Sequence, residues 1–258
     1  MRRVFRRITN QLYHMVFRLL SQKSPIKLQL WVIIRDVFNS IHHEPDSLFK
    51  EINFKISKGE LLKVPELRNI LHDDLLGVWS LDEESIYILW DMLLRHRPEV
   101  LIECGAGVST MVLACYASLT PLLNSVFPRI ICLEQNEDVK NSVESRLKKS
   151  DLNQYVKVLY SPIDQDGNYQ ISDAEMLKSL NGRLADLLLI DGPSGPPGCR
   201  ATTMPLLKRY CNENAQWLLD DALRDGELKA LQTWSNLQKV SVDGIYAVGK
   251  GLARGRLL

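Results

Sequence analysis

The sequence predicts an α/β fold in which helices cover both faces of a mostly parallel sheet. Two observations favour this class. Short apolar runs alternate with helix-compatible stretches, and the first run ends in a glycine turn that opens a helix. That turn lies in residues 101–110, LIECGAGVST. The chain has 258 residues, enough for a large core, so we expect one α/β domain over residues 79–258 after a helical extension over residues 1–78.

Each element of the domain is expected from its own pattern. Acidic residues between Leu81 and Ser85 suit the first turn of a helix over residues 81–95. Further helices are expected from Ser109, over 136–149 and around 201–212. Five apolar runs, bounded by polar or turn residues, are expected to form strands: 100–102, 129–134, 155–160, 185–190 and 216–219.

The last part of the domain is expected to be antiparallel. Residues 236–258 should supply the final strands, with 244–249 as one of them. The tail from Gly249 to Leu258 is rich in glycine and basic residues, and we expect it to fray.

The glycine turn predicts a ligand site. Gly105 and Gly107 allow a tight turn and a close approach to a ligand, and the following helix offers unpaired N–H groups. An acid, Glu103, precedes the first glycine, and Thr110 stands where a dinucleotide motif has its third glycine. A nicotinamide-dependent oxidoreductase is therefore disfavoured, while an ordinary glycine turn without a ligand stays as the alternative.

Polar residues at the strand ends support a site at one edge of the sheet. Parallel strands place their carboxyl ends together, and open α/β sheets bind ligands there. The acidic residues at or just after these ends are Glu134, Asp164, Asp191, Asp220 and Asp221.

Taken in order, these motifs resemble those of class I S-adenosylmethionine (SAM) methyltransferases. The pattern is Glu-x-Gly-x-Gly-x-Ser-Thr, then Ile-Asp-Gly-Pro, then Leu-Leu-Asp-Asp-Ala-x-Arg-x-x-Glu. It covers about residues 79–240 and is similar to a bacterial branch distantly related to the catechol-type O-methyltransferases. The resemblance implies SAM as the cofactor, a Rossmann-like, seven-stranded sheet, and residues 79–258 as the methyltransferase domain.

The resemblance also implies roles for single residues. Glu134 would accept hydrogen bonds from the ribose hydroxyls, and a carboxylate at Glu103 suits the cationic groups of SAM. Asp164 is a candidate for the adenine amino group, although turn chemistry explains Asp164 equally well. The complete set of expected cofactor-binding residues is Glu103, Gly105, Gly107, Ser109, Glu134 and Asp164.

Catechol-type enzymes hold a divalent cation with residues after strands four and five. The matching residues here are Asp191, Asp220 and Asp221, and oxygen ligands of this kind suit Mg²⁺, which would lower the pKa of an acceptor oxygen. The family's basic residue shortly after Asp191 is missing. Without a metal, Asp191 is the leading candidate for the catalytic base. In the alternative, Asp220 and Asp221 cap the next helix, and Arg224 pairs with them locally. Arg200 and Arg224 are candidates either for an anionic acceptor or for surface ion pairs.

The sequence therefore predicts a SAM-dependent methyltransferase that acts on a small molecule, a glycan or a lipid-linked intermediate. Asp-Gly-Pro stands where amide-methylating enzymes carry an Asn-Pro-Pro-Tyr type motif, which favours oxygen over nitrogen as the acceptor atom. The alternative is a non-catalytic SAM-fold scaffold or cofactor-sensing subunit that binds a partner through its N-terminal helix.

Charge and cysteine content indicate the cellular compartment of the protein and the partners it contacts. The net charge of +1 gives no footprint for nucleic acid, and five scattered cysteines indicate a reducing, cytoplasmic location. Residues 1–35 carry eight Lys or Arg and no Asp or Glu, so the remainder carries −7. An apolar stripe runs opposite the arginines, so residues 1–20 are expected either to contact the inner membrane surface peripherally or to pack on the domain or a partner. The stripe consists of Phe5, Ile8, Leu12, Met15 and Leu19.

Overall fold

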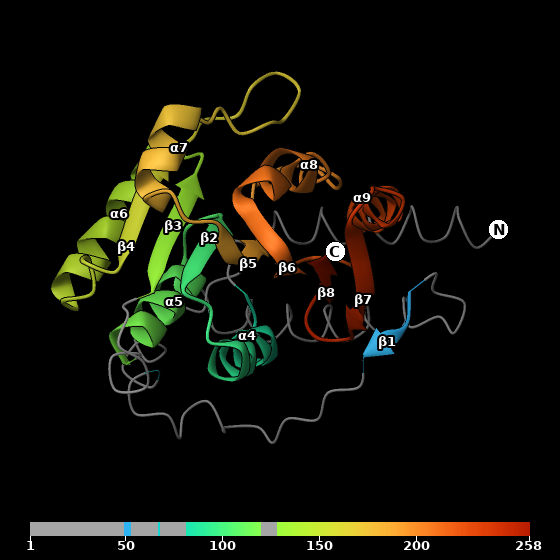
Figure 1. Ribbon diagram of the computed structural model, residues 1–258, viewed down its shortest axis with the longest axis horizontal. Helices are drawn as coiled ribbons and strands as arrows, with labels where there is room; N and C mark the ends of the chain where they lie inside the picture. The colour runs from blue at the N-terminus through green and yellow to red at the C-terminus, as the bar shows by residue number, and fades with distance from the viewer. Residues whose placement is uncertain (1–48, 53–66, 68–80, 120–127) are drawn as a thin grey trace, which may run out of the picture.

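The computed structural model describes residues 49–52, 67, 81–119 and 128–258, and it confirms the α/β class (Figure 1). One eight-stranded sheet has the strand order β1-β7-β8-β6-β5-β2-β3-β4. The strands are β1 (Glu51–Ile52), β2 (Val100–Cys104), β3 (Arg129–Glu134), β4 (Val156–Tyr160), β5 (Ala185–Ile190), β6 (Cys211–Leu219), β7 (Val240–Tyr246) and β8 (Leu252–Leu257).

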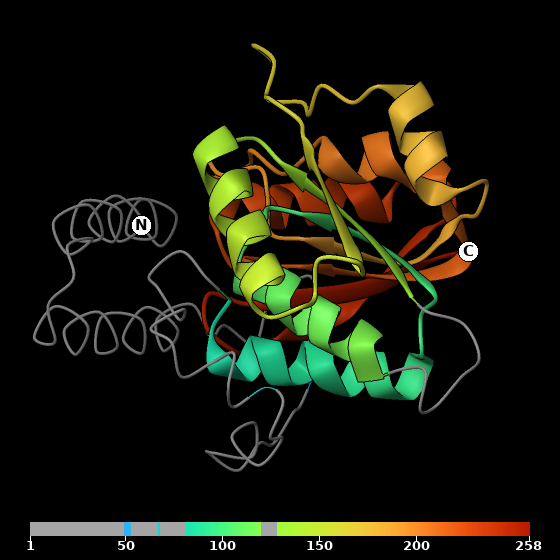
Figure 2. The ribbon, with the colours of Figure 1, turned by 90° about the vertical axis from the view of Figure 1, so that its left-hand side faces the viewer.

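Helices cover both faces of the sheet, as Figures 1 and 2 show. One buried cluster joins α4, α5 and α6 to the sheet, and a second joins α7, α8 and α9 to the opposite face. The helices are α4 (Glu83–His96), α5 (Val108–Leu119), α6 (Glu137–Lys149), α7 (Asp173–Leu180), α8 (Thr203–Leu207), which continues into the short η3 (Lys208–Tyr210), and α9 (Asp225–Ser235).

Strands β2 to β6 are parallel, so their carboxyl ends share one edge of the sheet. Helix starts follow local capping chemistry. The Asp82 carboxylate accepts hydrogen bonds from the amide and hydroxyl of Ser85 at the start of α4. The Asn136 side chain accepts from the amides of Asp138 and Val139 at the start of α6. These caps fix where each helix leaves the edge at which the strands end.

The expectation of a frayed tail is wrong. Strand β8 lies between β6 and β7 and is antiparallel to both, so it is hydrogen-bonded on its two sides. Its Leu252 and Ala253 are buried. The expected strand over 244–249 is displaced, because β7 ends at Tyr246 and the following residues form the turn into β8.

The sheet has one strand more than the seven expected. Glu51 and Ile52, which were assigned to the N-terminal extension, pair in parallel with Ile245 and Tyr246 of β7. Leu67 from the same segment is fully buried in the core. The rest of residues 1–78 lies outside the described residues, so the boundary at residues 78 and 79 stays a prediction. No helix in the described ranges has both the length and the apolar character needed to cross a membrane.

Candidate functional site

A cavity of about 650 Å³ opens where β2 and β3 end, at the edge predicted for ligand binding. The glycine turn forms its floor, the first residues after β3 and one side of α6 form one wall, and residues after β5 form the other. Its lining residues are Leu81, Gly105, Ala106, Gly107, Val108, Ser109, Glu134, Gln135, Asn136, Asp138, Val139, Ser142, Val143, Arg146, Asp191 and Ser194.

Glycine serves a different structural purpose at each of the two positions of the turn. Gly105 has φ +90, and a Cβ there would lie 3.0 Å from the carbonyl carbon of Asp191. Gly105 is therefore needed because β2 and the loop after β5 touch at this point. A Cβ on Gly107 would meet no atom within 4 Å. Gly107 therefore leaves open space in the cavity beside the start of α5, which is the kind of cradle that a bound ligand would fill.

Thr110 links the glycine turn to Glu103. Its Oγ1 accepts a hydrogen bond from the amide of Gly107 at 2.9 Å and donates one to Oε2 of Glu103 at 2.7 Å. Glu103 is 0% exposed and is not among the cavity-lining residues. Burial raises the pKa of Glu103 to about 7, although the hydrogen bond from Thr110 opposes this shift. Glu103 therefore stabilises the glycine turn through Thr110. Its contact with a cofactor stays a prediction.

Glu134, at the end of β3, lines the cavity and is 6% exposed. Its Oε2 accepts from the amide of Ala106 at 2.7 Å, and its Oε1 accepts from the amide of Asn136 at 2.8 Å. Burial raises the pKa of Glu134, while these backbone hydrogen bonds oppose the shift. Each carboxylate oxygen can accept a second hydrogen bond, so Glu134 can still bind two adjacent hydroxyls.

Two residues that the sequence did not single out meet at the rim of the cavity. The Gln135 side chain donates to the carbonyl of Ser194 at 3.1 Å and accepts from its amide at 2.8 Å. This reciprocal pair joins the loop after β3 to the loop after β5. No sequence signal marks it, because the two positions are brought together only by the strand order.

The other predicted cofactor residues divide between the cavity and its surroundings. Ser109 lines the cavity at the start of α5 and is buried. Asp164 is not among the lining residues. Its carboxylate accepts hydrogen bonds from the amides of Asp166 and Asn168, which is the turn arrangement weighed as the alternative. Its predicted contact with adenine therefore has no support from its position.

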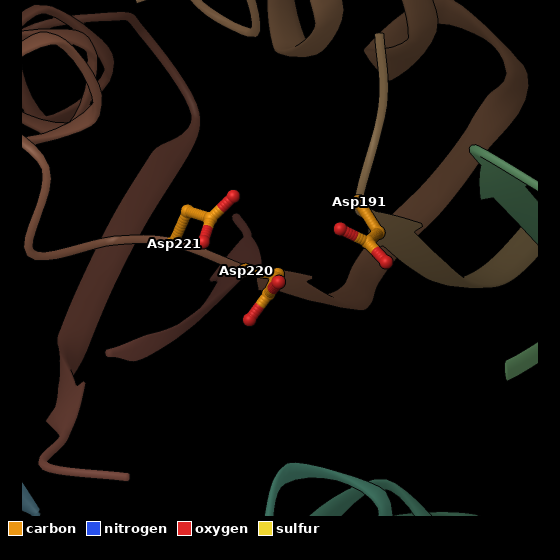
Figure 3. Close-up of side chains that lie close together, drawn as sticks. All are labelled: Asp191, Asp220 and Asp221. Atoms are coloured by element: carbon orange, nitrogen blue, oxygen red, sulfur yellow. The ribbon is translucent and has the colours of Figure 1, made fainter. Parts of the chain in front are cut away.

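Asp191, Asp220 and Asp221 come together as predicted (Figure 3). One carboxylate oxygen from each lies within 4.8 Å of the others. Asp191 follows β5 and Asp220 follows β6, while Asp221 has φ 57, a left-handed conformation that is uncommon for a non-glycine residue. The alternative in which these residues cap α9 is wrong, because the cap position of that helix is Arg224.

Three basic residues are packed against these aspartates. Arg200 contacts Oδ1 of Asp191 at 3.0 Å and Oδ2 of Asp221 at 2.9 Å, and it donates to the Asp220 carbonyl at 2.7 Å. Arg224 contacts the same Oδ2 of Asp221 at 2.8 Å, and Lys250 contacts Oδ1 of Asp221.

Both arginines are buried, with 4% and 8% exposure for Arg200 and Arg224. Surface ion pairing, one of the two roles expected for them, is therefore wrong. The local pairing of Arg224 with Asp221 is confirmed. No sequence signal points to Lys250, since its position depends on β8 lying next to β6.

This arrangement of charges gives the three aspartates different pKa values. Burial and then the charge of Asp220 raise the pKa of Asp191 well above its ordinary value, although Arg200 opposes the shift. Burial and the charge of Asp221 raise the pKa of Asp220 to about 6. Burial also disfavours the charged form of Asp221, but Lys250 and Arg200 outweigh it and hold the pKa of Asp221 well below its usual range.

A divalent cation does not fit this donor set. Both oxygens of Asp221 and one oxygen of Asp191 already contact cationic side chains. Within the described residues, Asp220 is the one aspartate of the three that forms no ion pair. A metal bound by all three would have to displace Lys250 or Arg200 and would lie beside the displaced positive charge.

Comparison with known proteins supports the fold. The sequence matches no known family model and has no match among the curated proteins. Among solved structures, it is similar to an O-methyltransferase from Bacillus cereus in complex with SAH, with 15% identity and a TM-score of 0.54 over 79% of this chain and 93% of that one.

Two further structures give the same result. A SAH-bound methyltransferase from Podospora anserina has 16% identity and a TM-score of 0.54 over 80% of this chain and 90% of its own. The O-methyltransferase TomG from Streptomyces achromogenes, in complex with SAM, has 14% identity and a TM-score of 0.51 over 87% and 96%. The protein therefore has the Rossmann-like fold of these methyltransferases, as the sequence resemblance predicted.

Proposed function

We propose that the protein is a SAM-dependent methyltransferase that transfers the methyl group to an oxygen atom. The observation that carries the proposal is the cavity between the glycine turn, Glu134 and Asp191. It offers open space at Gly107, a carboxylate that can still accept two hydroxyls, and a second carboxylate on the opposite wall. The similar structures that hold SAM or SAH support the same cofactor.

In this proposal the side chains bind the cofactor, orient the acceptor and remove the proton of its hydroxyl group. SAM supplies an activated methyl carbon when bound. The amides at the start of α5 and the Glu134 carboxylate hold the cofactor, and Glu134 accepts the ribose hydroxyls. Holding donor and acceptor in line contributes to the rate by proximity. Asp191 would take the proton of the acceptor hydroxyl, whose oxygen receives the methyl group from the sulfur of SAM and so leaves SAH. Burial raises the pKa of Asp191, which makes its carboxylate a stronger proton acceptor than an ordinary aspartate.

The acceptor class is proposed as a small molecule, a glycan or a lipid-linked intermediate with a free hydroxyl. A carboxylate base at the cavity wall suits a hydroxyl, and none of these acceptors requires a nucleic-acid surface. Cell extracts fractionated by polarity and incubated with methyl-labelled SAM would reveal the class. Label in the organic-extractable fraction would indicate a lipid-linked acceptor, and label in the aqueous fraction would indicate a small molecule or glycan.

Cofactor binding is tested by calorimetry with SAH. We expect the full chain to bind SAH in the micromolar range and Gly107→Val to lose at least about tenfold in affinity, because the added side chain fills the cavity. The variant should keep the melting temperature of the parent, since its Cβ meets no protein atom.

Two results would reject the proposal, and one would redirect it. Tight binding of NADH without binding of SAH would indicate a nicotinamide-dependent oxidoreductase instead. Unchanged SAH affinity in Gly107→Val would place the cofactor elsewhere. SAH binding without methyl transfer to any extract fraction would favour the non-catalytic, cofactor-sensing alternative.

A further inference from the structure

Lys250 reaches the acidic cluster from the far end of the sequence. It lies in the turn between β7 and β8, and β8 runs antiparallel beside β6. The turn is tied to the loop after β6 by hydrogen bonds from the Ala222 amide to the Gly251 carbonyl and from the Leu223 amide to the Lys250 carbonyl, each 2.9 Å. These backbone hydrogen bonds hold Lys250 beside the acidic cluster, where its ammonium contacts Asp221.

The charges of this cluster nearly cancel. Asp221 contacts three cations, and Arg200 also contacts Asp191. Glu227 is fully buried and accepts from the Gly198 amide at 2.9 Å, and its second oxygen lies 3.2 Å from Nε of Arg224. The cluster thus contains four carboxylates and three cations, a formal sum of −1: Asp191, Asp220, Asp221 and Glu227 with Arg200, Arg224 and Lys250.

We propose that the Lys250 ammonium, supported by Arg200, takes the place of a divalent cation between Asp191, Asp220 and Asp221, so that the site works without a metal. Lys250 is then a positioning residue that pairs with Asp221, while Arg200 joins Asp221 to Asp191. This inference concerns the same site and rests on the proposed methyl transfer. Its metal-binding part can be tested without an acceptor.

The experiment is a titration with Mn²⁺, followed by electron paramagnetic resonance of the free ion, on full chains. We expect the parent protein and Lys250→Arg, which keeps the positive charge, to show no stoichiometric site. Lys250→Met should gain one Mn²⁺ per chain, with affinity higher by at least about tenfold, because one positive charge next to the ion has been removed. A merely structural lysine would not produce this gain.

Two further variants make the result specific. Asp220→Ala in the Lys250→Met background should remove the gained site. Lys239→Met, which changes an exposed lysine paired with Glu213, should gain nothing.

The proposal is overturned if the parent protein binds one Mn²⁺ tightly and Asp220→Ala abolishes that binding. It is also overturned if Lys250→Met melts like the parent but gains no Mn²⁺. Should Lys250→Met not fold, the titration of the parent protein still decides. Calorimetry with SAH on the same samples separates this outcome from a failure of the proposed function.

Discussion

Glu103 shows at the scale of one residue what a motif can and cannot reveal. Its place before the glycines predicted a ligand contact, but the side chain lies beneath the turn and is held by Thr110. From the sequence, Thr110 indicates only that the third glycine of a dinucleotide motif is absent. The spacing of three residues between Gly107 and Thr110 is compatible with a side chain that accepts from the turn, yet the partner Glu103 becomes evident only when β2 and α5 are packed together.

The buried carboxyl of Glu103 predicts a specific pH dependence of stability. Burial raises its pKa to about 7 in the folded protein from the ordinary 4.5, so between these pH values the folded state binds more protons than the unfolded chain. The free energy of unfolding therefore falls as the pH rises, by about 3 kcal/mol in total from this group. Glu103→Gln cannot titrate and should lack this fall.

Urea unfolding of both proteins at pH 5 and pH 8 measures the effect. The variant should gain stability relative to the parent at the higher pH. Glu213→Gln, which changes an exposed side chain, controls for the amide itself. Equal pH profiles of the parent and Glu103→Gln would show that Glu103 is not a buried, protonated group.

At the scale of elements, hydrophobic pattern and turn residues were enough for the five strands β2 to β6 and for α4, α5 and α6. Each carries a clear period or a cap. The same reasoning failed for β8, because the segment LARGRL is short and carries two arginines. What makes it a strand is its position between β6 and β7, which pair with it on both sides. That is a property of the sheet, so the segment itself could not reveal it.

Gly255 tests whether β8 is part of the core. A Cβ at this position would collide with the Ser241 carbonyl oxygen and the Trp217 ring, so Gly255→Ala should lower the free energy of unfolding by about 3 kcal/mol. Gly182→Ala is a matched control in open space, where the positive φ alone should cost about 1–2 kcal/mol. Chemical unfolding of both variants measures the difference. A smaller loss for Gly255→Ala than for Gly182→Ala would mean that the tail is frayed after all.

At the scale of the whole molecule, the strand order assembles the candidate site from distant parts of the chain. Asp191, Asp220 and Asp221 could be predicted as neighbours, because parallel strands end at one edge. Lys250 could not, because it arrives through an antiparallel strand inserted next to β6. The sequence therefore predicted the anions of the cluster and missed Lys250, the cation that pairs with Asp221, and the Mn²⁺ titration proposed above decides between a metal ion and Lys250 at this site.

The distribution of charge over the chain leads to the last prediction. Residues 1–35 carry eight basic residues and no acidic ones, and the apolar stripe from Phe5 to Leu19 recurs at helical spacing. These residues lie outside the described part of the structure, so peripheral membrane contact through residues 1–20 stays a proposal. Each basic residue near an anionic leaflet contributes about 1 kcal/mol, and inserted apolar side chains add to this.

Co-sedimentation with vesicles that contain anionic lipid tests this contact. The full chain should pellet with anionic vesicles at low salt and be released at high salt, because salt screens the attraction. It should not pellet with neutral vesicles. A chain that begins at Ser24 should remain in the supernatant, and its SAH binding would show that the remaining domain is folded. If the full chain ignores anionic vesicles, or if the shortened chain aggregates, the basic segment instead packs on its own domain or on a partner.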